Sequence, residues 1–434
     1  MLNLFAKFVF RHLLRLVDNP RHLFFCGEPV FALSGYRWNR CMTPTNLALI
    51  RLDRLGDVVL SSHMVAGLRR AWPKSRITLI VRESLVDLAR LCPDVDEVIG
   101  VPVDEWGMLF DPETGKYGGW KRQLTKWLKI CHAVGIWKRR FDVAITPRWD
   151  TDYYGAILLA YLSGASQRWG VTERATSKKA RLNWGFDRLL TQIVAGEIVL
   201  HEFLLNESFL QQLNLPSDGG GKLVSWVVPS DQEKAVEIMR AAGVRRSKKT
   251  IIVCLGANSA PRRMWPVESY AQLCRAMFNP ELVQFVTVGT AAEQSLGRQF
   301  KALVGDIVIN LEGDIPLGLL PATVALGALY IGSDTGTMHL ASAAGVPVFE
   351  VSCHPMDGDA YWAESPLRFG PWGVPHRVVQ PEHATAPCLG HCDSGLAHCI
   401  LGVSVERAAA VLQSLLLELP RTEVINARAF QTLP

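Results

Sequence analysis

The stretch from Ile331 to Glu350 constrains the fold of this chain more than any other segment. Its residues predict an apolar strand that ends at Gly332, a tight turn, a helix over 337–344 and a second apolar strand over 346–351. Units in which strand, helix and strand follow one another are typical of parallel sheets covered by helices. The stretch therefore predicts an α/β fold.

The turn between the first strand and the helix has the chemistry of an anion site. Ser333, Asp334, Thr335 and Gly336 are all small or able to form hydrogen bonds. A helix that begins in such residues leaves several backbone N–H groups free and pointing one way, which suits a phosphate or diphosphate. Asp334 and His339 add ionisable groups at the same end, which favours a ligand site over a plain helix cap.

Strands and helices alternate in two series along the chain. The strands are almost continuously apolar, which is typical of parallel sheets buried on both faces. Strands are predicted at 47–52, 77–81, 98–101 and 141–146 in the first series, and at 250–255, 283–289, 307–310 and 328–332 in the second. We therefore expect an extension at 1–45 and two doubly wound domains at 46–220 and 221–434, with the ligand site in the cleft between them.

Composition narrows the class of protein. A length of 434 residues suits two domains, and 49% hydrophobic with 20% charged residues indicates globular cores. The net charge of +5 fits an anionic substrate, and no basic run with interleaved aromatics indicates nucleic-acid binding. No apolar run approaches the ~18–20 residues that span a bilayer. Ten scattered cysteines favour a reducing, cytoplasmic location.

Two segments stand outside the α/β pattern. Residues 1–17 predict a basic amphipathic helix, with Lys7, Arg11 and Arg15 on one face. Such a helix either lies on an anionic membrane, here the inner face of a bacterial inner membrane, or docks on its own protein. Residues 102–140 form a long insertion rich in Trp and Lys, which either covers a substrate or pads the surface.

Asp57 is the candidate base. It follows the first predicted strand in the loop Arg54-Leu-Gly-Asp57, at the start of a helix predicted over 58–72. A carboxylate at this end of a strand faces the cleft and can take a proton from an acceptor hydroxyl, although it can also act only as a helix cap. The loop lacks the three-glycine dinucleotide fingerprint, which argues against a nicotinamide enzyme.

A second loop, at 256–266, supplies candidate contacts to a diphosphate. Asn258 and Ser259 are short hydrogen-bonding residues, and Arg262 with Arg263 provides fixed positive charges. Glu293 lies in the first turn of the next predicted helix, where it either accepts hydrogen bonds from ribose hydroxyls or complements the helix dipole.

The C-terminal cysteines leave three interpretations open. Cys388, Cys392 and Cys399 lie close in the sequence to His391 and His398, but their spacing matches no standard paired zinc motif. A zinc site, a disulfide and buried free thiols are all compatible with the pattern.

Three motifs in this order resemble a known family. Ile50-Arg-Leu-Asp-Arg-Leu-Gly-Asp57, Arg263-Met-Trp-Pro266 and Ser333-Asp-Thr-Gly-Thr-Met-His339 are similar to segments of the ADP-heptose:lipopolysaccharide heptosyltransferases and their relatives, glycosyltransferase family 9. The resemblance covers about residues 46–415. It implies a GT-B fold, in which two Rossmann-like domains face each other across a cleft. It also implies inverting sugar transfer from a nucleotide sugar without a metal.

The resemblance also implies roles for single residues. Asp57 matches the family's presumed base, and Arg263 stands where a lysine usually contacts the donor diphosphate. Glu293 resembles the carboxylate that holds the ribose. The donor sugar and phosphate seat is matched by Asp334, Thr335, Gly336 and His339. The first 45 residues and the insertion at 102–140 depart from the family pattern, and acceptor contacts belong to the domain that carries the insertion.

The expected activity is transfer of a heptose from ADP-heptose to a cell-surface glycan such as the lipopolysaccharide core, with no cofactor besides the nucleotide-sugar donor. A protein acceptor and a GT-B nucleotide-sugar epimerase, which needs no acceptor, are the alternatives. A non-catalytic nucleotide-sugar or lipid-binding protein is a rival from another class. It is disfavoured because a candidate base and a diphosphate seat fall on facing domains.

Overall fold

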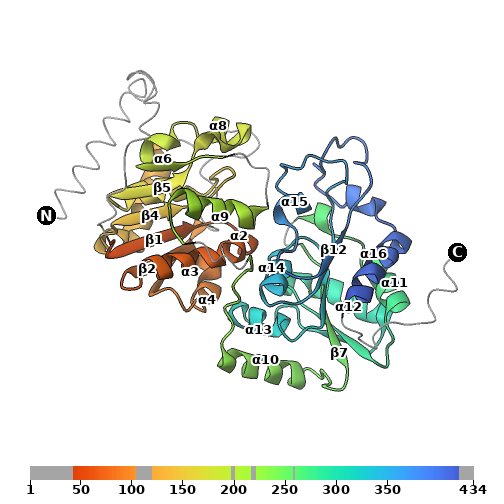
Figure 1. Ribbon diagram of the computed structural model, residues 1–434. Helices are drawn as coiled ribbons and strands as arrows, with labels where there is room; N and C mark the ends of the chain where they lie inside the picture. The colour runs from red at the N-terminus through yellow and green to blue at the C-terminus, as the bar shows by residue number, and fades with distance from the viewer. Residues whose placement is uncertain (1–42, 104–119, 197–200, 217–220, 258–259, 420–434) are drawn as a thin grey trace.

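The computed structural model describes residues 43–103, 120–196, 201–216, 221–257 and 260–419. Within them the chain forms two six-stranded sheets, each wholly parallel and each in its own half of the molecule (Figure 1). The first sheet contains β1 (Asn46–Arg51), β2 (Arg76–Arg82), β3 (Glu97–Val101), β4 (Val143–Thr146), β5 (Gln167–Val171) and β6 (Gln192–Val194). The second contains β7 (Lys249–Cys254), β8 (Val283–Thr287), β9 (Val308–Asn310), β10 (Leu329–Gly332), β11 (Val348–Val351) and β12 (His376–Val379).

The two sheets share one strand order. The first runs β3-β2-β1-β4-β5-β6 and the second β9-β8-β7-β10-β11-β12, so each half starts in the middle, grows to one edge and then returns to grow to the other. This is the Rossmann order, and it confirms the expected pair of doubly wound units.

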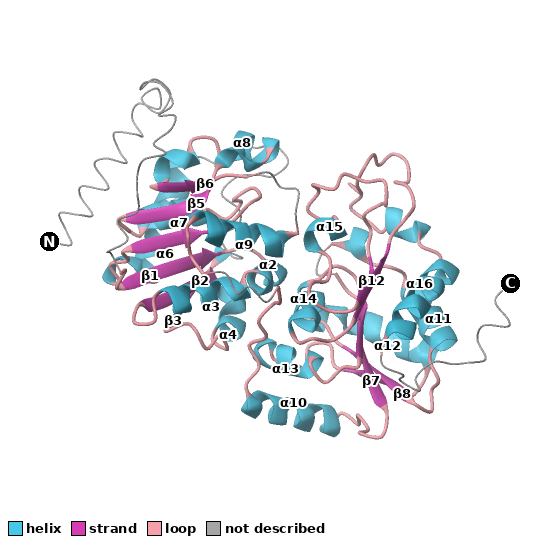
Figure 2. Cartoon of the chain, in the orientation of Figure 1, coloured by secondary structure: helices cyan, strands magenta, loops and turns pink. Residues whose placement is uncertain are grey.

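Helices cover both faces of each sheet (Figure 2). In the first half, β1 sends Leu47 and Leu49 to one face and Ala48 and Ile50 to the other, as strand alternation requires. The first face is covered by α2 (Leu55–Leu60), α3 (Ser62–Ala71), α4 (Val86–Ala89) and α9 (Glu202–Gln212), and the second by α6 (Trp120–Ala133), α7 (Ala156–Leu162) and α8 (Ser177–Leu182).

The second half is built in the same way. Its outer face is covered by α11 (Val267–Met277), α12 (Gln294–Val304) and α16 (Val405–Glu418), and its inner face by α10 (Pro229–Ala241), α13 (Leu320–Val324) and α14 (Gly336–Ala343). A short helix, α15 (Pro366–Phe369), lies in the irregular segment between β11 and β12.

The helix predicted over 58–72 is wrong in its extent. The structure has α2, which begins earlier at Leu55, and then α3, with a break at Ser61. The Ser61 hydroxyl donates back to the carbonyls of Asp57 and Val58, at 3.1 and 3.0 Å. Such bonds compete with the helical ladder, which explains the break.

The segment predicted as an insertion at 102–140 has a structural role. Its helix α6 buries Trp127, Ile130 and Cys131 against the second face of the first sheet. This part of the segment therefore belongs to the core of the first half, while residues 104–119 lie outside the described residues.

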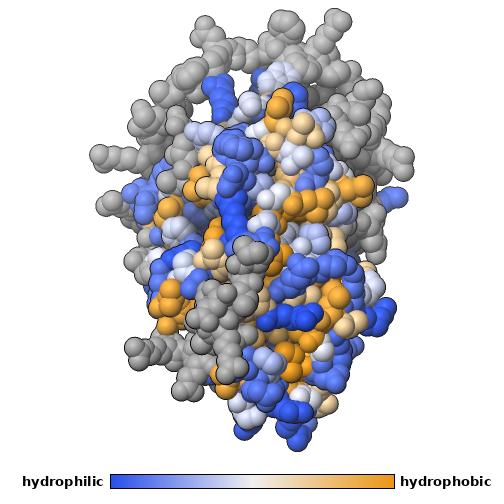
Figure 3. Space-filling view, turned by 90° about the vertical axis from the view of Figure 1, so that its right-hand side faces the viewer, coloured by the Kyte–Doolittle hydropathy of each residue, from blue (hydrophilic) through white to orange (hydrophobic). Residues whose placement is uncertain are grey.

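The amphipathic helix expected at 1–17 also lies outside the described residues. Among the described ones, no helix combines the length and apolar character needed to cross a membrane. On the side of α11, α12 and α16, hydrophobic residues form separate groups among hydrophilic ones (Figure 3).

Candidate functional site

The motif residues lie at the carboxyl ends of the strands where each sheet reverses direction. In the first sheet these strands are β1 and β4, which lead to Asp57 and Arg148. In the second they are β7 and β10, which lead to the loops around Arg263 and Asp334. Ligands of doubly wound sheets bind at these switch points. The two points face each other, because α2 packs against α14 across the boundary between the halves (Figure 1).

Two glycines allow this close approach. A Cβ atom on Gly336 would lie 2.1 Å from Cδ2 of Leu55, and one on Gly56 would lie 2.6 Å from Cδ2 of His339. Each glycine therefore leaves room for a side chain of the other half. The first and third motifs, far apart in the sequence, meet through these contacts.

Asp57 is half-buried in the first turn of α2 and has two firm partners. Its Oδ2 accepts a hydrogen bond from the Arg54 backbone N–H at 3.1 Å, and its Oδ1 lies 2.9 Å from Nη1 of Arg148. Burial works to raise the pKa of Asp57, but the charges of Arg148 and Arg51 outweigh it and the pKa is lowered. Asp57 is therefore ionised at neutral pH.

The neighbouring Asp53 responds in the opposite way. Burial raises its pKa, and the charges of Arg148 and Arg51 do not overcome this effect. Environments that separate the pKa values of two adjacent carboxyl groups are typical of acid–base sites. Of the two carboxylates, Asp57 is the one that stays ready to accept a proton.

Sequence reasoning missed the network that holds these carboxylates. Arg51 is fully buried at the end of β1, and its Nη2 lies 3.1 Å from Oε1 of Glu202. Arg368 from α15 lies 3.4 Å from both Asp150 and Glu202, so it joins the second half to the first. Only Arg51 is marked in the sequence, as the one charged residue in the apolar strand predicted at 47–52. The other members come from distant segments without a local motif.

Arg263 and Arg262 converge on one buried carboxylate. Nε of Arg263 lies 3.0 Å from Glu364, and its Nη1 lies 3.3 Å from Asp334. Nε of Arg262 lies 3.0 Å from both oxygens of Glu364. Burial opposes the charge of Arg263, but Asp334 and Glu364 raise its pKa further above its ordinary value. Asn258 and Ser259, predicted for the same loop, lie outside the described residues.

Two tyrosine hydroxyls hold the turn before α14 in place. Ser333 Oγ lies 3.1 Å from the hydroxyl of Tyr270, and Thr335 Oγ1 lies 3.1 Å from that of Tyr330. Thr335 is the N-cap, so the N–H groups of Gly336 and Thr337 have no partner within the helix, whereas that of Met338 donates to the Thr335 carbonyl at 3.1 Å. His339 is buried one turn later, with Nε2 3.6 Å from Oδ1 of Asp334. The geometry is that of an anion seat facing α2.

Glu293 lies beside this seat, at the ends of two strands of the second sheet. It is the last residue of a short 3-10 helix (Ala291–Glu293), and its Oε2 accepts from the N–H of Thr290 at 2.7 Å. Its side chain lies over Gly256 and Gly289, where a Cβ atom would meet a Glu293 oxygen at 1.9 and 2.7 Å. The carboxylate therefore occupies the same edge of the sheet as the other donor-side residues.

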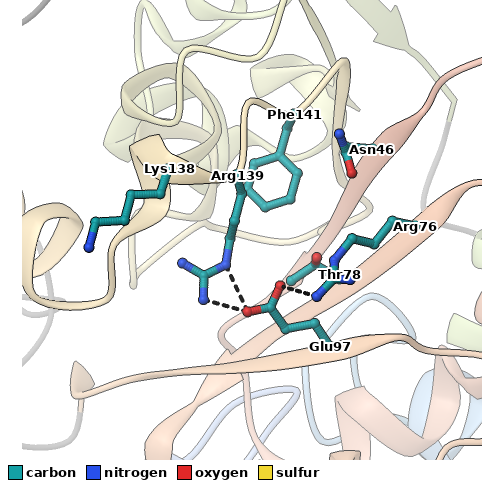
Figure 4. A pocket seen from close by; sticks show the side chains of 7 residues that line it. All are labelled: Asn46, Arg76, Thr78, Glu97, Lys138, Arg139 and Phe141. Carbon is teal, nitrogen blue, oxygen red and sulfur yellow. Dashed lines mark hydrogen bonds and ion pairs between the residues drawn. The ribbon is translucent and has the colours of Figure 1, made fainter. Parts of the chain in front are cut away.

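A pocket of about 390 Å³ lies at the opposite, amino end of the first sheet (Figure 4). Arg76 and Arg139 both pair with Glu97 in it. It is separate from the switch points, and the pairing with Glu97 uses its arginines. We therefore place the functional site at the facing switch points and not in this pocket.

Comparison with known proteins identifies a family and several relatives of this chain. A family model described as "Glycosyltransferase family 9 (heptosyltransferase)" matches residues 141–398. A Haemophilus influenzae protein provisionally named as a glycosyltransferase is 22% identical over 311 residues, which cover 69% of this chain and 80% of the relative.

Solved structures of similar fold include a family 9 glycosyl transferase from Veillonella parvula, with a TM-score of 0.64 and 19% identity over 86% of this chain and 98% of that one. Escherichia coli ADP-heptose lps heptosyltransferase II has a TM-score of 0.59 and 17% identity over 86% and 99%. Escherichia coli heptosyltransferase WaaC, solved with ADP, has a TM-score of 0.60 and 13% identity over 85% and 99%. These likenesses confirm the expected GT-B fold.

Proposed function

The chain belongs to glycosyltransferase family 9, and from this premise we propose that it transfers a heptose from ADP-heptose to a hydroxyl group of a cell-surface glycan such as the lipopolysaccharide core. The proposed reaction inverts the configuration at the anomeric carbon and uses no metal. One observation carries the proposal: an ionised Asp57 on one half faces an anion seat on the other, across the contact between α2 and α14.

The chemistry is a single displacement. Asp57 takes the proton of the acceptor hydroxyl as its oxygen attacks the anomeric carbon, and the bond from that carbon to the diphosphate oxygen breaks. The proton ends on Asp57, and the negative charge ends on the departing ADP. Because its pKa is low, Asp57 is a weak but always ionised base. It therefore takes the proton only when the acceptor hydroxyl has become more acidic, in the transition state.

The second half supplies the groups that stabilise the departing diphosphate. The N–H groups at the start of α14 and the side chains of Arg262 and Arg263 lie at the same edge of the second sheet, after β10 and β7. Glu364 pairs with Arg262 and Asp334 pairs with Arg263, so both arginines are neutralised by carboxylates. The donor diphosphate must therefore share an arginine with a carboxylate or displace that carboxylate. Asp334 is the easier one to displace from Arg263, since Glu364 is the more buried of the two carboxylates.

The remaining donor contacts are assigned to residues that lie next to the turn before α14. Glu293 lies beside the seat, where it can accept from ribose hydroxyls, and His339 lies between Asp334 and Gly56 at the junction of the halves. Asn258 and Ser259 complete the proposed donor loop. A WaaC structure with ADP and another with ADP-2-deoxy-2-fluoro heptose support ADP-heptose as the donor class.

Titration calorimetry with ADP, ADP-heptose, UDP and GDP, all with a metal chelator present, tests the donor. We expect ADP and ADP-heptose to bind and the other two to bind at least about tenfold more weakly, because a base pocket that hydrogen-bonds one base rejects another. A preference for UDP or GDP would refute the donor assignment and keep the mechanism.

Release of ADP from ADP-heptose, with and without a heptose-free lipopolysaccharide core, tests the reaction type. The proposal requires release that depends on the acceptor. Conversion of the donor without any acceptor would instead support the epimerase alternative. Transfer of the sugar only to a protein would show that the acceptor is a protein and not a glycan.

A further inference from the structure

Three thiols and an imidazole converge in the irregular segment of the second half, apart from the residues of the proposed transfer site. One ligand atom from each of Cys388, Cys392, His398 and Cys399 lies within 4.8 Å of the other three. Three of these residues lie in a loop and only Cys399 begins a short 3-10 helix, so regular secondary structure does not bring the four together. A shared ligand would explain why these four side chains lie together.

The distances match those of a tetrahedral metal site. Metal–sulfur bonds of ~2.3 Å and metal–nitrogen bonds of ~2.0–2.1 Å at tetrahedral angles place a sulfur and a nitrogen ligand about 3.5 Å apart. Nδ1 of His398 lies 3.5 Å from Sγ of Cys388 and 3.5 Å from Sγ of Cys399. Both nitrogen–sulfur distances are therefore those expected for ligands that share one ion.

The surroundings also suit thiolate ligands. The three cysteines are 7%, 2% and 0% exposed, and they form a small cluster of their own beside Ala384. Backbone N–H groups point at two of the sulfurs: Asp393 at Cys388 and Thr385 at Cys399, both at 3.4 Å. Outer hydrogen bonds of this kind orient metal ligands and stabilise their charge.

The other interpretations explain less. A disulfide would use two of the three sulfurs and leave the third, with the imidazole, unaccounted for. Burial as ordinary hydrophobic residues describes Cys92 and Cys274, each of which lies among aliphatic side chains, but it gives no reason for three thiols to share one place. His391, the other histidine of the segment, stacks on Trp362 with ring centroids 3.5 Å apart and is not a member of the group.

We propose that Cys388, Cys392, His398 and Cys399 bind one structural metal ion. Three thiolates and one imidazole form a closed tetrahedral set, which selects zinc, or iron by the same ligand chemistry. Four protein ligands leave no open position for a substrate, so the ion takes no part in sugar transfer. The proposal is independent of the donor and acceptor assigned above.

The ion would tie together the least regular part of the chain. Between β11 and α16 the chain has only α15, β12 and a short 3-10 helix (Cys399–Gly402), although this segment carries Glu364 and Arg368. The N–H of Asp359 donates to the carbonyl of Gly390 at 2.7 Å, which fastens the cysteine loop to the stretch that leads to Glu364. Metal binding would therefore stabilise the region that partners Arg263.

The first test is the metal content of the full-length protein, purified under reducing conditions without chelator and measured by inductively coupled plasma mass spectrometry. We expect about one zinc or iron ion per chain. Thiolate-to-iron absorption in the visible range identifies iron, and a colourless protein with bound metal identifies zinc. Wild-type protein that holds neither ion, even after incubation with zinc or ferrous salts, would refute the proposal, as would a disulfide detected among the three cysteines by mass.

Variants then locate the ion. We expect Cys392→Ala and Cys399→Ala to lose the metal and Cys274→Ala, a matched buried cysteine in α11, to keep it. Should the first two fail to fold, alkylation of the wild type replaces them: Cys388, Cys392 and Cys399 should react only after the metal is chelated. Equal reactivity with and without chelator, or metal retained in both variants, would overturn the assignment.

Discussion

At the scale of single residues, Arg148 sets the charge of Asp57. Its guanidinium lies 2.9 Å from one Asp57 oxygen and 3.4 Å from Asp53, and it is itself held by the two carboxylates it neutralises. Burial would otherwise raise the pKa of Asp57. The charge of this arginine therefore keeps the proposed base ionised below neutral pH.

Replacing Arg148 with Gln should move the acid limb of the pH–rate profile upwards by about one unit or more. The sign follows because loss of a nearby positive charge raises the pKa of Asp57, so that the carboxyl is protonated, and inactive as a base, at higher pH. The measurement is kcat/KM for transfer across the acid range. Arg69→Gln, which removes an arginine paired with Asp96 elsewhere in the same half, is the control. Profiles that coincide would contradict the assignment.

The residues of the site divide into those with a local signal and those without one. Asp57 and the turn at 333–336 were predictable because each follows an apolar strand and opens a helix. Glu202, Glu364 and Arg368 were not, because they reach the site through tertiary contacts between segments more than a hundred residues apart. An ion pair between such segments leaves no pattern in a single sequence.

At the scale of elements, the contact between α2 and α14 decides whether base and anion seat face each other. Most strands and helices followed from apolar runs and caps, but this contact did not, since it depends on how two domains approach. Gly336 and Gly56 show in retrospect why two motif positions are glycine: each is covered by a side chain of the other half. The motif glycines therefore serve packing between the domains as well as backbone access to a ligand.

Gly336→Ala should lower the transfer rate by about 100-fold, since a misplacement of about 1 Å between reacting groups has that effect. Its Cβ atom would lie 2.1 to 2.7 Å from three atoms of Leu55, so the two helices must separate. Gly318→Ala is the matched control: it also lies on the second half, opposite Asp87, but its Cβ atom would make only ordinary contacts from 3.5 Å. Similar rates for the two variants would show that the close approach is not needed for transfer.

At the scale of the whole molecule, the irregular segment after β11 holds the two halves together. Nε2 of His201 donates to the carbonyl of Gly370 at 2.9 Å, while its Nδ1 accepts from the N–H of Phe203. Its ring stacks on Trp372 with centroids 4.5 Å apart. The imidazole is therefore satisfied only in its neutral form, and burial lowers the pKa of His201 to about 4.

This histidine should make the assembly sensitive to acid. Its pKa is lower in the folded than in the unfolded protein, so its contribution is complete above the ordinary histidine value and is lost as pH falls towards 4. The loss amounts to about 3 kcal/mol of unfolding free energy. Urea unfolding from about pH 7 to about pH 4.5 should show a steeper decline for the wild type than for His201→Gln, which keeps the donor to Gly370 but does not titrate.

The exposed His132 provides the control for that experiment, since His132→Gln should follow the wild type. If His201→Gln lost stability with acid as steeply as the wild type, the neutral imidazole between the halves would not be the acid-sensitive group.

In the proposed mechanism, Asp57 is the base for a transfer in which the other half holds the donor. Acceptor-dependent ADP release by Asp57→Asn, measured beside calorimetric binding of ADP-heptose, tests it most directly. We predict a loss in kcat of about 10²–10⁴-fold, with donor affinity nearly unchanged, because general-base catalysis contributes that much and the donor seat lies on the second half. Asp87→Asn, an exposed carboxylate on α4, should match the wild type. Unchanged turnover in Asp57→Asn, or loss of donor binding together with turnover, would contradict the role of Asp57 as the base.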